Sequence, residues 1–251
     1  MSIGNVIGSN ITNLLLILGL SASIQPILFK KEIKYLDIPI CIFITIIFVI
    51  ICNTERKVTF NNGLLLIFMF VCFILYTIAV ALKEKEKTEK IIDNEQNGKE
   101  KSKSTILNIA YIILGIAALK IGGDLTVNSA VEIAQKLNIS EKIISITIVS
   151  IGTSLPELVT SVSAAVKKKC DIAIGNIIGS NIFNMLLIIG TTAVINPIEY
   201  STAYNKDAII LIIATIVLEL YAFIPPKDKL TRKNGAIYFL MYIAYMLTLF
   251  I

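Results

Sequence analysis

The feature of this sequence that most restricts its fold is an internal repeat. Residues 3–27 read IGNVIGSNITNLLLILGLSASIQPI, residues 174–198 read IGNIIGSNIFNMLLIIGTTAVINPI, and 17 of the 25 aligned positions are identical. Each copy is apolar and long enough to span a bilayer as a helix. Repetition at this level indicates a copied structural unit rather than shared hydrophobicity. The fold must therefore contain two equivalent membrane segments.

The rest of the chain holds further apolar runs of membrane-spanning length. Of its 251 residues 55% are hydrophobic, and the mean hydropathy is +0.79. Such values indicate a polytopic membrane protein, and the runs lack the alternation of barrel strands. We predict an all-α fold with about eight transmembrane helices, at residues 3–24, 36–52, 63–82, 106–137, 143–166, 172–195, 207–224 and 235–251.

A charged stretch divides the chain into two halves. Residues 83–104 contain seven lysines, six acidic residues and almost no apolar side chain, which predicts a solvated linker. The predicted units are an N-terminal half at residues 1–82, this charged linker, and a C-terminal half at residues 105–251.

The distribution of basic residues predicts the orientation in the cell membrane. One side holds 17 Lys and Arg residues and the other holds 5. The positive-inside rule then places residues 83–104 in the cytoplasm and the C-terminus outside. The two repeat copies run in opposite directions, and inverted-topology repeats are typical of secondary transporters. The net charge of +5 therefore reflects topology in the lipid bilayer and does not indicate nucleic-acid binding.

Polar side chains recur at matching positions of the two copies. Ser9 and Asn13 lie four residues apart, as do Ser180 and Asn184, so each pair shares one helix face. The glycines of each copy, also four residues apart, are explained by close helix packing. Packing does not explain hydroxyl and amide groups, which are costly in a bilayer unless their oxygens are used.

The stretch GTSLPELVTS places a proline and a carboxylate inside an apolar segment. Pro156 cannot donate to the carbonyl four residues earlier, which frees backbone oxygens. Thr153 and Ser154 add hydroxyls, and a charge such as Glu157 within a span is a functional hypothesis by default. Hard cations such as calcium and sodium prefer these oxygen ligands. The chain has no histidine and its four cysteines are scattered singly, which argues against zinc or copper.

These motifs together resemble a known family. GTSLPELVTS followed by DIAIGNIIGSNIFN is similar to the alpha-repeat of the calcium/cation antiporters, the sodium/calcium exchanger superfamily. LGIAALKIGGDLTVNSAVEIAQ resembles the long helix that begins the second half of these proteins. The resemblance implies an antiporter, not an enzyme, that exchanges sodium for calcium across the membrane by alternating access. It also implies Ca²⁺ and Na⁺ as bound, transported ions, and no catalytic cofactor.

The resemblance further implies a set of ion ligands. Some family members carry Asp where this chain has Asn184, so the site here has a lower negative charge. The implied ligands are Glu157, Asn184, Ser180, Thr153, Ser154, Ser150 through its backbone carbonyl, Asn13 and Ser9.

In that family each repeat has two helices, and the core has ten. No second Gly-Thr-Ser-x-Pro-Glu motif precedes residue 3 in this chain. With Glu157 as the one carboxylate of the site, calcium affinity should fall steeply. We therefore expect this chain to be a truncated form whose activity on its own is impaired. Upstream sequence would supply the missing N-terminal helices.

Other functions also fit parts of the sequence. Calcium/proton or potassium-linked exchange stays open, because the residues do not fix the ion pair. A non-transporting membrane scaffold or subunit would keep the fold, and Glu157→Gln would then change only stability. An intramembrane hydrolase using Ser154 is disfavoured, because the sequence has no Gly-x-Ser-x-Gly motif and no histidine.

Overall fold

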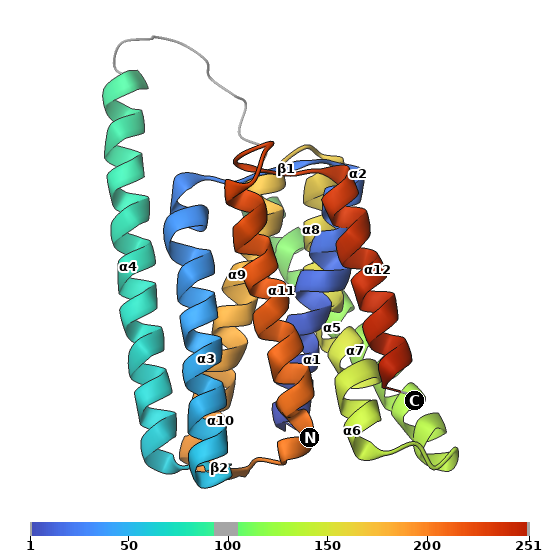
Figure 1. Cartoon of the computed structure of the whole chain (residues 1–251). Coiled ribbons are helices and arrows are strands. Elements are labelled where there is room, and N and C mark those ends of the chain that lie inside the picture. The colour runs from blue at the N-terminus through green and yellow to red at the C-terminus, as the bar shows by residue number, and fades with distance from the viewer. Residues whose placement is uncertain (1, 93–104, 250–251) are drawn as a thin grey trace.

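Each repeat copy forms one continuous helix with a π-helical middle in the computed structural model, which describes residues 2–92 and 105–249 (Figure 1). The first copy consists of α1 (Ser2–Ile11), the π-helix η1 (Thr12–Leu18) and α2 (Gly19–Ile24). The second consists of α9 (Cys170–Phe183), the π-helix η4 (Asn184–Ile188) and α10 (Ile189–Ile195). π-Helical turns within α-helices are rare and occur frequently at functional sites. Here one repeat asparagine lies in each of them, Asn13 in η1 and Asn184 in η4.

The other elements surround these two helices. The first half adds the π-helix η2 (Ile33–Asp37), α3 (Ile38–Glu55) and α4 (Phe60–Ile92). The second half adds α5 (Thr105–Lys136), α6 (Glu141–Ile144), the π-helix η3 (Ser145–Val149), α7 (Ser150–Thr153), α8 (Leu155–Val166), the 3₁₀-helix η5 (Thr202–Tyr204), α11 (Asn205–Phe223) and α12 (Arg232–Thr248). Four two-residue strands complete the fold: β1 (Ile27–Leu28), β2 (Lys57–Val58), β3 (Ile198–Glu199) and β4 (Lys229–Leu230).

Two small antiparallel sheets show that the repeat copies run in opposite directions. β1 follows the first copy and pairs with β4, with Ile27 opposite Leu230, whereas β3 follows the second copy and pairs with β2, with Lys57 opposite Glu199. Figure 1 places β1 and β2 at opposite ends of the bundle. The first copy therefore ends where β1 lies and the second copy ends where β2 lies, which confirms the predicted inverted-topology repeat.

Among the four candidate membrane spans in the described part of the chain, the first copy is the most buried. In the most apolar 18 residues of Ile3–Ile24, 83% are buried, against 50% in Cys170–Ile195 and 6% in Phe60–Lys83. Figure 1 accordingly shows α4 at the outer edge, and this helix packs on α10. The polar residues of the first copy thus lie in the interior, where an unsatisfied polar group costs most.

All eight expected spans fall in helices to within a few residues, which confirms the helical class. Among the described residues, four helices are long and apolar enough to cross a membrane: Ile3–Ile24, Ile33–Glu55, Phe60–Lys83 and Cys170–Ile195. The bent pair Glu141–Thr153 and Leu155–Val166 makes five if it counts as one span. The expected count of eight spans therefore stays a prediction.

The charged linker differs from expectation at its start. Helix α4 continues to Ile92, ten residues into the segment expected to be a flexible loop at residues 83–104. Residues 93–104 lie outside the described part of the chain. The division into halves at 1–82 and 105–251 stays a prediction.

Candidate ion-binding site

A break in one helix places the glutamate of GTSLPELVTS. Helix α7 ends at Thr153, α8 begins at Leu155, and the two flanking helical segments are bent by 48° relative to each other. Pro156 lies in the first turn of α8, where its missing N–H leaves no gap in the new helix. Glu157 also lies in this first turn, and the partial positive charge of a helix N-terminus stabilises a carboxylate there.

The carboxylate lies beside a cavity between the two halves of the chain. This cavity, called the ion pocket below, has a volume of about 160 Å³. Five of its lining residues belong to the set predicted from sequence, and three more were not predicted. It is lined by Ser9, Thr153, Ser154, Glu157 and Asn184 from the predicted set, together with Asn5, Val6 and Ile188.

Hydroxyl groups from both halves meet at one wall of the ion pocket. The hydroxyl oxygens of Ser9 and Thr153 lie 2.8 Å apart, and Ser9 Oγ also lies 3.4 Å from the backbone carbonyl of Ser150. Thr153 Oγ1 donates to Asn5 Oδ1 over 3.1 Å. Asn5 was missed by the sequence analysis, although it belongs to the same repeat motif. Its position one turn before Ser9 was the available signal.

Two other lining residues of the ion pocket carry oxygens without protein partners among the described residues. Ser180 Oγ donates to Glu157 Oε1 over 2.8 Å. Within the described part of the chain, Glu157 Oε2 and Ser154 Oγ are buried and make no hydrogen bond. Leaving buried oxygens unpaired costs free energy, whereas a bound cation would satisfy them. The donor set fits a hard cation.

The remaining predicted residues lie just outside the lining. Ser150 is fully buried, and its hydroxyl donates to the backbone carbonyl of Ser145 over 2.7 Å. Asn13 is fully buried, donates to Asn181 Oδ1 over 3.0 Å, and keeps its own Oδ1 without a hydrogen bond among the described residues. The structure therefore gathers all eight predicted residues in one region, while their role as ion ligands stays a prediction.

The charge of this region is low. Within the residues that the structure describes, no group of three or more His, Cys, Asp or Glu side chains is arranged to hold a metal ion. One carboxylate with neutral oxygens is a weak site for transition metals, which prefer nitrogen and sulfur ligands. It suits ions that must be released as well as bound.

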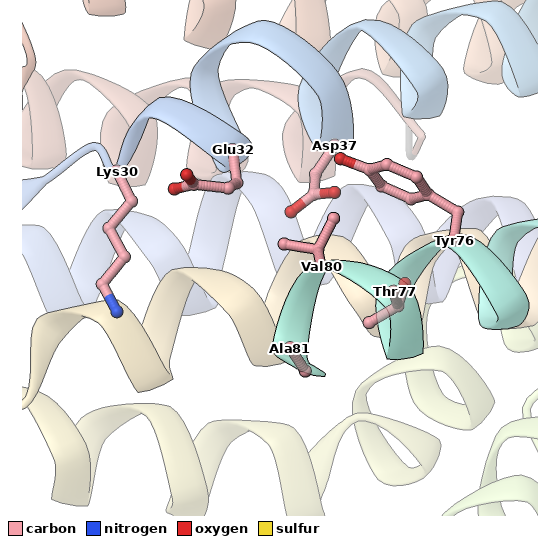
Figure 2. Close-up of a pocket in the computed structure, with 7 residues that line it drawn as sticks. All are labelled: Lys30, Glu32, Asp37, Tyr76, Thr77, Val80 and Ala81. Atoms are coloured by element: carbon pink, nitrogen blue, oxygen red, sulfur yellow. The ribbon is translucent and has the colours of Figure 1, made fainter. Parts of the chain in front are cut away.

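A second cavity lies between residues 30–37, which include η2, and helix α4 (Figure 2). It has a volume of about 180 Å³, and Figure 2 shows Glu32, Asp37 and Tyr76 around it. Its other lining residues are Lys30, Thr77, Val80 and Ala81. Lys30 forms an ion pair with Asp171 over 3.1 Å. No residue of the first repeat copy or of GTSLPELVTS lines this cavity, so the repeat does not explain it.

A comparison with protein families assigns the chain. The model of the sodium/calcium exchanger protein family matches residues 1–79 and 107–251, on both sides of the charged linker. The chain belongs to this family. Sodium/calcium exchanger family proteins are membrane transporters and not enzymes, which confirms the resemblance found in the motifs and excludes the hydrolase.

Two relatives of this exchanger-family protein match most of its length, and a third matches about half of it. The uncharacterized membrane protein MJ0091 of Methanocaldococcus jannaschii is 32% identical over 97% of this chain and 74% of its own length. The inner membrane protein YrbG of Escherichia coli is 31% identical over 88% of this chain and 68% of its own. The sodium/calcium exchanger MaX1 of Methanosarcina acetivorans is 38% identical over 47% of this chain and 34% of its own.

A solved structure gives the same fold. The sodium-calcium exchanger NCX_Mj, soaked with 10 mM Na⁺ and 10 mM Sr²⁺, matches with a TM-score of 0.74 and 29% identity, over 98% of this chain and 75% of that chain. This match confirms the all-α, multi-pass membrane architecture. Together with family membership it supports cation exchange as the function of the exchanger-family chain described here.

Proposed function

We propose that this protein exchanges sodium for calcium across a membrane, with the ions bound in the ion pocket. The observation that carries the proposal is the position of Glu157, beside oxygen groups of both halves and with one carboxylate oxygen unpaired. The direct ligands would be Glu157, Asn184, Ser180, Thr153, Ser154, Ser9, Asn13 and the backbone carbonyl of Ser150. The related proteins named sodium/calcium exchangers support this choice of ions.

The same oxygens can serve both ions in turn. Calcium and sodium both bind hard oxygen ligands, so one occupant excludes the other from a cavity of about 160 Å³. A single carboxylate neutralises one of the two charges of calcium, whereas it fully neutralises sodium. We therefore expect weak calcium binding that sodium displaces, and impaired exchange by this chain alone.

Inverted repeats supply the alternation of access. Because the two copies run in opposite directions, a movement that opens the pocket to one side has an equivalent that opens it to the other. The 48° bend lies beside Ser154, where one helical segment ends and the segment that carries Glu157 begins. The positive-inside rule supports a cytoplasmic charged linker and an outward C-terminus.

The test combines binding with a charge-removing substitution. Calcium binding to the purified chain in detergent is measured by ⁴⁵Ca²⁺ dialysis, with sodium as competitor, for the unchanged protein and Glu157→Gln. Glu132→Gln is the matched control, because Glu132 is exposed on α5 and pairs with Lys136. We expect sodium-sensitive binding that Glu157→Gln abolishes and Glu132→Gln leaves intact.

Flux in proteoliposomes then separates the ion pairs. Calcium uptake driven by an outward sodium gradient supports the proposal. Uptake driven instead by a proton or potassium gradient would favour the calcium/proton or potassium-linked alternatives. Equal calcium binding by the unchanged protein and Glu157→Gln would overturn the proposal and favour a non-transporting scaffold.

A further inference from the structure

Four asparagines, three of them buried and the fourth in the lining of the ion pocket, join the two repeat copies. They are Asn10 and Asn13 from the first copy and Asn181 and Asn184 from the second, and they are called the asparagine cluster below. Asn10 Nδ2 donates to the backbone carbonyl of Asn181 over 3.1 Å, and Asn181 Nδ2 donates to the backbone carbonyl of Asn10 over 3.3 Å. These two residues occupy the same position of the repeat, so the exchange is two-fold symmetric.

The second pair of contacts follows the same symmetry. Asn184 Nδ2 donates to Asn10 Oδ1 over 3.0 Å, and Asn13 Nδ2 donates to Asn181 Oδ1 over 3.0 Å. Asn10, Asn13 and Asn181 are at most 1% exposed. Of the four, Asn184 lines the ion pocket.

The backbone carbonyls fix which way each amide points. A carbonyl only accepts, so the end of the Asn10 side chain that faces the Asn181 carbonyl must be its NH₂ group. Its Oδ1 is then turned toward Asn184, which must offer its own NH₂ group. The side-chain oxygen of Asn184 is left facing away from Asn10 and available to the pocket. Exchanging oxygen and nitrogen in either amide would set two donors or two acceptors against each other.

We propose that Asn10 and Asn181 are positioning residues of the ion site: each fixes the amide of a proposed ion ligand in the other copy, Asn184 in the pocket lining and Asn13 just outside it, so that the amide oxygen of that ligand is turned toward the bound cation. This inference rests on the proposed function of that pocket. The unpaired Oδ1 of Asn13 is the oxygen that the same arrangement leaves over in the other copy. The dipole presented by each amide is thereby set before an ion arrives.

A purely structural cluster would look different in a binding experiment. If the four amides only join the helices, then Asn10→Ala lowers stability, and the folded fraction binds calcium as before. If Asn10 acts through Asn184, its loss weakens binding, and this weakening disappears once Asn184 is gone. A double-mutant cycle separates the two cases.

The experiment measures the calcium Kd of the full chain in detergent for Asn10→Ala, Asn184→Ala and the double variant, and the thermal midpoint of each. Outer partners of metal ligands typically contribute 10- to 100-fold in affinity, so we expect Asn10→Ala to raise the Kd about 10-fold. In the Asn184→Ala background the same substitution should change the Kd less than about twofold. Asn181→Ala, paired with Asn13→Ala, should give the same pattern.

Asn53→Ala is the matched control. Asn53 and Asn205 also exchange two amide hydrogen bonds, of 3.1 and 2.9 Å, but Asn53 is exposed and neither residue lines a cavity described above. This variant should leave the Kd unchanged. An unchanged Kd in Asn10→Ala, with Glu157→Gln still abolishing binding, would overturn the positioning role alone. The positioning role would also be overturned if Asn10→Ala weakened calcium binding equally in the presence and absence of Asn184. If Glu157→Gln left calcium binding unchanged, both the proposed function and this inference would be overturned.

Discussion

The hydroxyl oxygens of Ser9 and Thr153 lie 2.8 Å apart, although the two residues belong to different halves of the chain. Each hydroxyl carries one proton, and acceptors are close to both, at Asn5 Oδ1 and the carbonyl of Ser150. Lone pairs on these oxygens therefore remain for a cation. A cation bound to these two oxygens would therefore contact both halves of the chain.

Replacing Thr153 by valine should weaken ion binding without unfolding the protein. Valine keeps the shape and removes the oxygen, so the calcium Kd should rise roughly fivefold, which corresponds to about 1 kcal/mol. Thr153→Ser keeps the hydroxyl and should bind nearly as the unchanged chain does. The control is Thr77→Val on the outer helix α4, whose hydroxyl donates to the carbonyl of Phe73. Equal Kd values for Thr153→Val and Thr153→Ser would contradict a role for this hydroxyl.

Equivalent glycines of the two copies should respond differently to alanine. A Cβ atom at Gly8 would collide with Ser150 Oγ and lie 2.6 Å from the carbonyl oxygen of Ile146, whereas at Gly179 it would meet no described heavy atom within 4 Å. We expect Gly8→Ala to destabilise the protein by about 1–3 kcal/mol. Gly179→Ala should be neutral or stabilising, because alanine favours helices. Thermal unfolding in detergent measures both, and matching losses would contradict the packing described for Gly8.

The ion pair between Lys142 and Asp207 should contribute more to the free energy of unfolding than an exposed ion pair does. Asp207 is 2% exposed, lies 3.0 Å from Lys142 Nζ without hydrogen-bond geometry at that oxygen, and accepts a hydrogen bond from Tyr245 over 2.9 Å. Lys142→Met leaves this buried carboxylate without its cation and should cost about 2–3 kcal/mol.

The matched control for that pair is Lys136→Met. Lys136 pairs with Glu132 on the surface of α5, and exposed pairs of this kind contribute at most about 0.5 kcal/mol. Chemical unfolding monitored by circular dichroism compares the two variants. If Lys142→Met lowered the free energy of unfolding no more than Lys136→Met does, the buried ion pair would not stabilise the protein more than the exposed one.

Replacing Pro156 by alanine, which restores a backbone N–H group at this position, should change the shape of the ion pocket. Pro156→Ala allows a hydrogen bond to the carbonyl of Gly152, which favours a straight helix across the 48° bend. Straightening moves Glu157 relative to Ser9, so calcium affinity should fall while thermal stability is kept or rises. A spin-label distance across the bend, measured by electron resonance, reports the straightening. An unchanged distance together with an unchanged Kd would contradict this role of the proline.

The sequence predicted the chemistry of the site better than its contacts. Glu157, Thr153 and Ser154 were predicted because a charge and hydroxyls in an apolar segment are costly unless used. Asn10 belongs to the same repeat motif, but nothing in its own helix indicates that its partners are Asn181 and Asn184. Hydrogen bonds between residues more than 170 positions apart depend on how the two copies cross, and helical periodicity carries no information about crossing.

The repeat itself also misled in one respect. The glycine spacing in the two copies predicted close helix packing around both, and within the described residues such packing is found at Gly8 but not at Gly179. The copies have the same sequence pattern but different neighbours, because η3 and α7 approach the first copy. The prediction that residues from 83 onward form a solvated linker was wrong at the end of α4 for another reason. Its run of lysine and glutamate has high helix propensity, and the helix continues to Ile92, beyond the continuous apolar run that ends at Leu82.

The two small sheets change how the halves of the molecule should be regarded. β1 of the first half pairs with β4 of the second, and β2 of the first half pairs with β3 of the second, at opposite ends of the bundle. The halves are therefore interlaced rather than placed side by side. Because these pairings join the halves at both ends of the bundle, two separately synthesised fragments, divided between residues 92 and 105, should assemble into the same transporter fold.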